Sequence, residues 1–228
     1  MTSTLVVTGA SRGLGRHVAE QALVAGYQVL GLSRQPPADA PFPIQACDVA
    51  DPDAVQAALA PLKRDSSFFG LVNAAGIASM NLTLFTPPAT AARILAVNLL
   101  GTIHCCQVAG RFLARWGRGR IINFSTIAVP LAIEGEAIYA ASKAGVETFS
   151  RIFAREMAPH GVTVNVVAPG PIATDLIARV PAERIQAIVE RQVVPRPGTP
   201  QDVWHAVQLL LSPQADMISG QVIHVGGV

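Results

Sequence analysis

The sequence predicts an α/β protein built on one doubly wound parallel sheet with helices on both faces. Apolar runs rich in Val, Ile and Leu recur along the chain, which is typical of parallel strands covered on both sides. Stretches with apolar residues at helical spacing lie between these runs. Half of the 228 residues are hydrophobic and 14% are charged, a composition that excludes a disordered chain.

Predicted strands and helices alternate along the whole chain. Strands are predicted at residues 5–7, 27–32, 44–47, 68–72, 120–124, 162–167 and 221–225. Helices are predicted at 14–25, from 51 onwards, at about 90–116, about 136–158, 181–192 and 200–211. Asp51 is the expected N-cap of the second helix, with Pro52 at its first helical position. The Pro-rich loop at 36–43 is too short to separate domains, so we expect a single domain over residues 1–228.

Charge and cysteine usage restrict the partners and the compartment. The net charge is +2 without a basic tract, which argues against nucleic acid as a partner. The N-terminus lacks the pattern of a signal peptide and no apolar run approaches the length of a membrane span, so we expect a cytoplasmic protein without a membrane partner. Cys47, Cys105 and Cys106 lack metal-ligand spacing, as do the five histidines, so no metal site is predicted.

A glycine-rich turn joins the first predicted strand to the first helix. It carries Gly9, Gly13 and Gly15, and such a turn lets backbone N–H groups approach a pyrophosphate at the positive end of a helix. The spacing is G-x-x-x-G-x-G instead of G-x-G-x-x-G, and three glycines can also form an ordinary tight turn. Its place between strand and helix favours a dinucleotide site in a Rossmann-type sheet.

Several further motifs match one family. They are Asp48-Val49 after the third strand, Asn73-Ala74-Ala75-Gly76 after the fourth, Asn98 in the long helix, Tyr139-x-x-x-Lys143, and Pro169-Gly170-Pro171-Ile172-x-Thr174 after the sixth. With the T-G-x-x-x-G-x-G turn, these motifs make the chain resemble the classical short-chain dehydrogenase/reductase family over its whole length. The resemblance implies that Asp48 and Val49 contact the adenine, that the turn at 73–76 lines the cofactor channel, and that Ile172 and Thr174 hold the nicotinamide end.

The end of the second strand selects the nicotinamide cofactor. An acidic residue there would bind the free ribose hydroxyls of NAD, but this chain has Ser33-Arg34. Arg34 and Arg12 are suited to clamp a 2′-phosphate, although both can also be solvated surface arginines. NADPH/NADP+ is therefore predicted in preference to NADH. The expected cofactor-binding residues are Gly9, Ser11, Arg12, Gly13, Leu14, Gly15, Arg34, Asp48, Val49, Asn73, Ala74, Ala75, Gly76, Tyr139, Lys143, Pro169, Gly170, Ile172 and Thr174.

Tyr139 and Lys143 are the strongest candidates for catalysis. The chain has only two tyrosines and two lysines, so a Y-x-x-x-K pair is expected by chance only about 0.02 times. On a helix the two side chains share one face. Reduction of a carbonyl by hydride requires a proton donor, and a nearby ammonium is expected to bring the pKa of the phenol towards neutrality. The resemblance further implies that Lys143 binds the nicotinamide ribose.

Two further polar positions complete the predicted catalytic set. Asn98 lies among apolar residues, where the resemblance implies that it holds a proton-relaying water; it can also satisfy backbone groups at a helix kink. The hydroxyl that contacts the substrate carbonyl is Thr126 if the following loop keeps the family's common length, and Ser125 if that loop contains an insertion. Ala74 departs from the family, which often has Asn there, and we expect this change to be tolerated.

The predicted activity is NADPH-dependent reduction of a ketone to a secondary alcohol. The closest resemblance is to the 3-oxoacyl-[acyl-carrier-protein] reductase group, which implies a 3-oxoacyl thioester of acyl carrier protein or CoA and a role in fatty acid biosynthesis. The apolar and Arg residues at 173–197 suit such a substrate. Two alternatives are a short-chain dehydrogenase/reductase acting on a sterol, sugar or polyketide intermediate, and a catalytically silent cofactor-binding module. The resemblance also implies a homo-oligomer, usually a tetramer.

Overall fold

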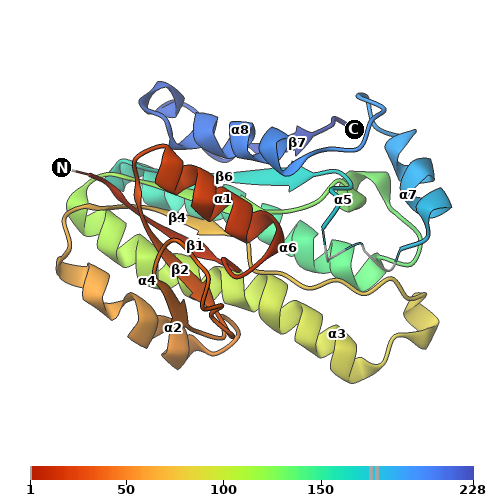
Figure 1. Cartoon of the computed structure of the whole chain (residues 1–228), viewed down its shortest axis with the longest axis horizontal. Helices are drawn as coiled ribbons and strands as arrows, with labels where there is room; N and C mark the ends of the chain where they lie inside the picture. The colour runs from red at the N-terminus through yellow and green to blue at the C-terminus, as the bar shows by residue number, and fades with distance from the viewer. Residues whose placement is uncertain (1, 175–176, 178–179) are drawn as a thin grey trace.

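The computed structural model describes residues 2–174, 177 and 180–228. In this part of the chain seven parallel strands form one sheet in the order β3-β2-β1-β4-β5-β6-β7 (Figure 1). The strands are β1 (Thr4–Thr8), β2 (Gln28–Ser33), β3 (Ile44–Ala46), β4 (Phe68–Asn73), β5 (Gly119–Phe124), β6 (Val162–Pro169) and β7 (Val222–Val225). The predicted doubly wound parallel sheet is therefore confirmed.

Helices cover both faces of this sheet. The α-helices are α1 (Gly13–Val24), α2 (Pro52–Leu59), α3 (Pro88–Leu95), α4 (Gly101–Trp116), α5 (Ala128–Leu131), α6 (Ala137–Met157), α7 (Ala182–Val189) and α8 (Pro200–Leu211). Helices α1 and α8 pack together over one face, while α2, α4 and α6 pack over the other. The helices on each face enclose a separate apolar core with the sheet. Every residue of β1, β5 and β6 is buried between these two cores. Burial on both faces explains why these strands are rich in Val, Ile and Leu, although they also bury polar residues such as Asn123 and Asn165.

The strand order creates the place for a ligand. The chain leaves β1 towards β2 on one side of the sheet, whereas β4 lies on the other side of β1. Connections on the two sides therefore diverge at the carboxyl ends of β1 and β4, and this divergence leaves a crevice at the edge of the sheet. The glycine turn after β1 and the turn after β4 both open into it.

The long helix predicted at about 90–116 begins at Pro88 and is not regular. Residues Ala96–Leu100 (η3) form a π turn between α3 and α4. The continuous helix Pro88–Trp116 is 29 residues long and apolar enough to cross a membrane by length and composition, so the expectation that no such run exists is wrong. Its α4 half packs against β4, β5 and α6 and buries Cys105, Cys106 and Leu113 completely, as the core helix of a globular domain does.

Other boundaries differ only slightly from the predicted ones, apart from one missed helix. Asp51 caps α2 as predicted, because its carboxylate accepts hydrogen bonds from the N–H groups of Asp53 and Ala54. The short helix α5, directly after β5, has no counterpart among the predicted elements. It contains a Pro and spans one turn, which is too short for a helical period to show in the sequence.

Candidate active site

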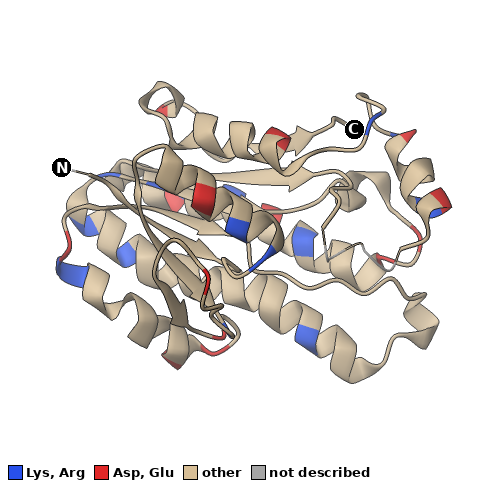
Figure 2. Ribbon diagram, in the orientation of Figure 1, with Lys and Arg blue, Asp and Glu red and all other residues tan. Residues whose placement is uncertain are grey.

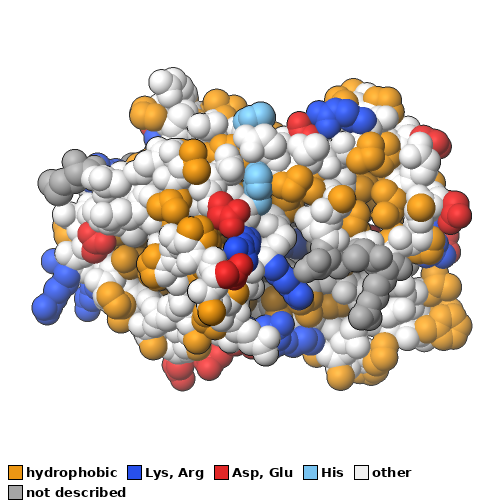
Figure 3. All heavy atoms as spheres, in the orientation of Figure 1, with side chains coloured by type: hydrophobic (Ala, Val, Ile, Leu, Met, Phe, Trp, Pro, Cys, Tyr) orange, Lys and Arg blue, Asp and Glu red, His pale blue; other side chains and the backbone are white. Residues whose placement is uncertain are grey.

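A deep cleft of 1420 Å³ opens at the carboxyl ends of the strands. It exceeds the 300–1,000 Å³ or so of a typical small-molecule site, so it has room for a dinucleotide together with a substrate. Its walls come from the turns after β1, β2, β4 and β5, from α6 and from α7. Basic side chains stand at the amino end of α1, and hydrophobic side chains gather over α7 and the turn before α3 (Figures 2 and 3).

The glycine turn has the backbone that a phosphate site requires. Gly9 and Gly13 have φ values of +68° and +57°, in the left-handed region that favours glycine. A Cβ on Gly15 would lie 2.3 Å from the carbonyl oxygen of Gly9, so only glycine allows α1 to start this close to the turn. The predicted residues of this turn, namely Gly9, Ser11, Arg12, Gly13, Leu14 and Gly15, all line the cleft. The amino end of α1 therefore faces the space where a pyrophosphate would bind.

The end of β2 places a cation at one end of the cleft. Arg34 lines this end with Ser33, whose hydroxyl is held by the backbone of Gln35. The nearest following acidic residue, Asp39, does not line the cleft, because its carboxylate binds Arg16 through two hydrogen bonds of 3.2 and 3.0 Å. No carboxylate directly after β2 therefore competes with a 2′-phosphate.

Asp48 and Val49 line the same end of the cleft, as predicted. Asp48 is also part of the framework: one carboxylate oxygen accepts from the N–H of Ala50, and the other lies 2.7 Å from the guanidinium of Arg93. Burial alone would raise the pKa of Asp48, but the hydrogen bond from Arg93 reverses this and the pKa lies below its usual value. The residue therefore remains ionised while it fixes the loop that carries Val49.

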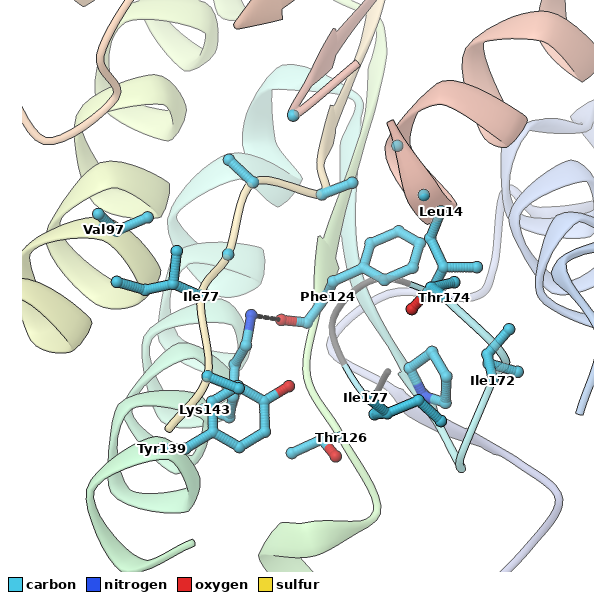
Figure 4. A pocket seen from close by; sticks show the side chains of 18 of the residues that line it. Leu14, Ile77, Val97, Phe124, Thr126, Tyr139, Lys143, Ile172, Thr174 and Ile177 are labelled. Atoms are coloured by element: carbon cyan, nitrogen blue, oxygen red, sulfur yellow. Dashed lines mark hydrogen bonds between the residues drawn. The ribbon is translucent and has the colours of Figure 1, made fainter. Parts of the chain in front are cut away.

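Helix α6 presents its catalytic face to the other end of the cleft. Tyr139 and Lys143 are both buried, and both line the cleft (Figure 4). Burial raises the pKa of the Tyr139 phenol, the charge of Glu136 raises it further, and a hydrogen bond with Thr126 partly offsets the rise. Burial also lowers the pKa of Lys143 to about 8.

The expected effect of Lys143 on Tyr139 is not seen in this structure. The ammonium of Lys143 donates a 2.8 Å hydrogen bond to the carbonyl oxygen of Phe124, and Lys143 is not among the groups that shift the pKa of Tyr139. The physical reason is the depth of the site, because burial of the phenol raises its pKa by more than the neighbouring groups lower it. Lys143 instead joins α6 to the end of β5.

The structure gives different hydrogen-bond partners to the two candidate hydroxyls, those of Thr126 and Ser125. Thr126 lies beside the ring of Tyr139 in the cleft, where its Oγ1 accepts the N–H of Ala128 and its hydroxyl hydrogen-bonds with Tyr139 (Figure 4). Ser125 also borders the cleft, but its hydroxyl donates to a carboxylate oxygen of the buried Glu147 at 2.7 Å. Thr126 is thus the hydroxyl that stands beside Tyr139 in the cleft, and Ser125 is committed to the core.

Asn98 lies behind the cleft wall and joins three segments. Its side-chain oxygen accepts the N–H of Ile77 at 2.9 Å, and its amide donates to the carbonyl of Ile77 and to the hydroxyl of Ser142. This agrees with the alternative in which Asn98 satisfies backbone groups, although the groups belong to the turn after β4. The space beside Gly76 separates Asn98 from Lys143, since a Cβ there would lie 3.5 Å from the Asn98 oxygen and 3.6 Å from the Lys143 nitrogen.

One predicted cofactor residue is not brought to the cleft. Asn73 is buried at the end of β4, and its amide donates to the side-chain oxygen of Asn123 at 2.9 Å. A strand residue alternates sides, so Asn73 points into the core while the turn that follows it faces the crevice. The remaining predicted residues Ala74, Ala75, Gly76, Pro169, Gly170, Ile172 and Thr174 line the cleft.

Sequence reasoning missed two charged residues of the site, Glu136 and Arg184. Glu136 is the N-cap residue of α6, three positions before Tyr139, and Arg184 lies on α7. The position of Glu136 was a usable signal, because it stands at the start of the helix whose first turn carries Tyr139. Four residues of the predicted substrate segment 173–197, at 175–176 and 178–179, lie outside the described residues.

Comparison with known proteins identifies the class. The family model described as enoyl-(acyl carrier protein) reductase matches residues 9–227. With the parallel sheet, the glycine turn and the Tyr-Lys pair, this match shows that the chain belongs to the short-chain dehydrogenase/reductase family, whose members are NAD(P)-dependent oxidoreductases.

Relatives narrow the group. The chain is 36% identical to the 3-oxoacyl-[acyl-carrier-protein] reductase FabG of Staphylococcus aureus, over 100% of this chain and 98% of the relative. It is also 36% identical to the short-chain reductase protein NovJ of Streptomyces niveus, over 99% and 93% of the two chains. It is thus most like the FabG group of reductases.

Solved structures agree with this assignment. The aldohexose dehydrogenase of Thermoplasma acidophilum in ligand-free form is 30% identical, with a TM-score of 0.90 over 99% of this chain and 93% of that chain. ElxO with NADP bound is 25% identical, with a TM-score of 0.90 over 99% and 97%. The shared architecture therefore covers nearly the whole length of each protein.

Proposed function

We propose that this protein reduces the ketone of a 3-oxoacyl thioester, carried by acyl carrier protein or CoA, to the secondary alcohol with NADPH. The observation that carries the proposal is the convergence of Tyr139 and Thr126 in one cleft. Similarity to FabG over the whole chain supports the thioester, and NADP bound to the related ElxO supports the cofactor. Similarity to NovJ supports the second candidate, a ketone or alcohol outside fatty acid biosynthesis.

The cleft fits a nicotinamide dinucleotide. The glycine backbone at the start of α1 would cradle the pyrophosphate, and Arg34 with Arg12 would hold the 2′-phosphate of NADP. Ile172 and Thr174 would border the nicotinamide. When bound, this group supplies the hydride. We expect a much lower KM for NADPH than for NADH, and equal values would contradict the NADP preference.

The chain's own residues supply the proton and position the carbonyl. The hydroxyl of Thr126 would turn from Tyr139 to donate to the carbonyl oxygen of the substrate, and the phenol of Tyr139 gives its proton to the same oxygen as negative charge develops there. A cation near the phenol would lower the raised pKa of Tyr139. Lys143 can act in this way while it holds the Phe124 carbonyl, because its ammonium keeps its charge and two further N–H groups.

The mouth of the cleft suits a carried acyl chain. Ile185 and Ile188 of α7 line it with apolar surface, and Arg184 provides a cation for an anionic carrier. Exposed apolar side chains on the helices opposite α1, Leu100 at 47% and Ile152 at 55%, support assembly into a homo-oligomer, for which we propose a tetramer. We further propose a cytoplasmic location without membrane or nucleic-acid partners. Light scattering of the purified protein measures the oligomer.

The decisive experiment is NADPH oxidation with an acetoacetyl thioester. We expect turnover by the native chain and a loss of at least about 10²-fold in Tyr139→Phe, which keeps the ring but removes the proton donor. Unchanged turnover in Tyr139→Phe would refute the catalytic assignment of Tyr139, whereas absence of turnover of any ketone by the native chain would favour the silent binding module. Turnover of other ketones but not of the thioester would favour the second candidate.

A further inference from the structure

Glu136 is a carboxyl of the cleft that the reduction does not use. It is the N-cap residue that precedes α6, with backbone angles outside the helical region, and its side chain lines the same cleft as Tyr139 and Lys143. Its charge raises the pKa of Tyr139, so the two groups are close enough to interact. Glu136 therefore borders the space where the reacting carbonyl binds.

The Glu136 carboxyl also makes no contact that stabilises the described part of the fold. Glu136 occupies the N-cap position of α6, yet its side chain makes no capping hydrogen bond. Among the residues that the structure describes, no hydrogen-bond or ion-pair partner is found for the carboxyl, in contrast to Glu147 further along the same helix, which binds Ser125 and Arg151. Burial raises the pKa of Glu136. A half-buried carboxylate is costly unless a cation or a donor approaches it.

None of the other charged groups on the described cleft wall pairs with the Glu136 carboxyl. They are Arg12, Arg34, Asp48, Lys143 and Arg184. Arg12, Arg34 and Asp48 belong to the far end formed by the turns after β1, β2 and β3, and the Lys143 ammonium binds the Phe124 carbonyl. Arg184 stands exposed on α7. Moreover, an unpaired Glu136 opposes catalysis, because its charge raises the pKa of Tyr139.

We propose that Glu136 binds an ammonium group carried by the substrate next to its ketone. A bound cation would neutralise the carboxylate and remove its unfavourable effect on Tyr139, so that recognition and proton donation improve together. The inference rests on the proposed ketone reduction and narrows it: the substrate class is an amino ketone, either free or as an amino-substituted 3-oxoacyl thioester. A neutral acyl chain would leave the carboxyl unpaired.

Two ketones of the same shape test the charge alone. The 1,1-dimethyl-4-oxopiperidin-1-ium ion carries a permanent positive charge, and 4,4-dimethylcyclohexanone is its neutral carbon counterpart. The measured quantity is the ratio of kcat/KM for the cation to kcat/KM for the neutral ketone with NADPH. We expect the native chain to prefer the cation, and Glu136→Gln to lower the ratio about tenfold, which corresponds to 1.4 kcal/mol. Glu136→Gln removes the same charge beside Tyr139 for both substrates, so the ratio reports only what the positive charge of the substrate contributes.

A matched control and a pH profile separate recognition from structure. Glu134→Gln removes the same charge two residues earlier, at an exposed position outside the cleft, and should leave the ratio unchanged. In the native chain the ratio should rise with pH as the Glu136 carboxyl ionises, whereas Glu136→Gln should show a flat ratio.

Binding of the cation completes the test. Titration of 1,1-dimethyl-4-oxopiperidin-1-ium into the protein–NADP+ complex should give a Kd about tenfold higher in Glu136→Gln than in the native chain. If neither ketone nor an acetoacetyl thioester is reduced, the proposed function fails, yet this Kd still measures recognition by Glu136. If ketones are reduced but the native chain shows no preference for the cation and no difference in Kd from Glu136→Gln, the role of Glu136 is overturned while the reductase stands.

Discussion

Exchange of Thr126 and of Ser125 for Ala should have opposite consequences. Thr126→Ala removes the hydroxyl that faces the substrate carbonyl beside Tyr139, and loss of one such donor lowers kcat by about 10²–10³-fold. It also removes the 3.2 Å hydrogen bond from Ala128, which should cost only about 1 kcal/mol of stability. Thr126→Ser keeps the hydroxyl and should recover most of the activity.

Ser125→Ala should lower stability and leave catalysis nearly intact. The Ser125 hydroxyl donates at 2.7 Å to Glu147, whose side chain is 8% exposed and keeps only the 3.2 Å contact with Arg151 after the exchange. Loss of a hydrogen bond to a buried charged group costs about 1.5–3 kcal/mol. In a protein of this size that loss lowers Tm by roughly 3–12 °C.

Calorimetry and steady-state kinetics on the same preparations provide the comparison. Activity must be normalised to folded protein, so that instability of Ser125→Ala does not appear as lost catalysis. The reasoning is refuted if Ser125→Ala loses more kcat than Thr126→Ala at equal folded fraction. It is also refuted if Thr126→Ser is as inactive as Thr126→Ala, because the methyl group of Thr126 would then matter more than its hydroxyl.

Three other predictions follow from the cofactor end and from Lys143. Arg34→Ala should raise the KM for NADPH about tenfold or more and leave that for NADH nearly unchanged, because only the 2′-phosphate meets the guanidinium; equal effects on both would contradict this placement. Gly15→Ala should abolish binding of either nucleotide in a fluorescence titration, since its Cβ would lie 2.3 Å from the Gly9 oxygen. Burial lowers the pKa of Lys143 from its usual value of 10.5 to about 8. Between these two pH values the unfolded chain therefore binds more protons than the folded chain does. Native stability relative to Lys143→Met should therefore rise over this range, by up to about 3 kcal/mol in denaturant unfolding; a constant difference would contradict it.

The fold was predictable because its strands are buried on both faces. The strands β1, β5 and β6 are buried along their whole length and rich in Val, Ile and Leu, so they stand out from the helical segments between them. Helix α5 and the π turn at Ala96–Leu100 were not predictable, because one turn of helix leaves no period and a π turn interrupts one. The estimate of the apolar run was wrong for another reason: the helix at about 90–116 was predicted as one element, but its apolar composition was not judged sufficient for a membrane span.

The site was predictable where chemistry fixes the residue type. Glycines of the phosphate turn and the Tyr139-Lys143 pair have few substitutes, so their spacing identified them. The direction in which a side chain points could not be predicted in this way, because adjacent residues in a turn can point to opposite sides. Ser125 and Thr126 both follow β5, and only the position of Glu147 on α6 shows which hydroxyl is already bound. Asn73 was misplaced for the same reason.

The π turn in the long helix has a consequence for any redesign of this protein. A regular α-helix advances about 100° per residue, and a π turn accommodates roughly one extra residue without breaking the helix. The sides of α3 and α4 that meet the rest of the protein are therefore out of phase with each other. Deleting one residue within Ala96–Leu100 would restore a regular helix, but either α3 would swing its apolar side into solvent or the Asn98 amide would turn away from the Ile77 backbone that it holds.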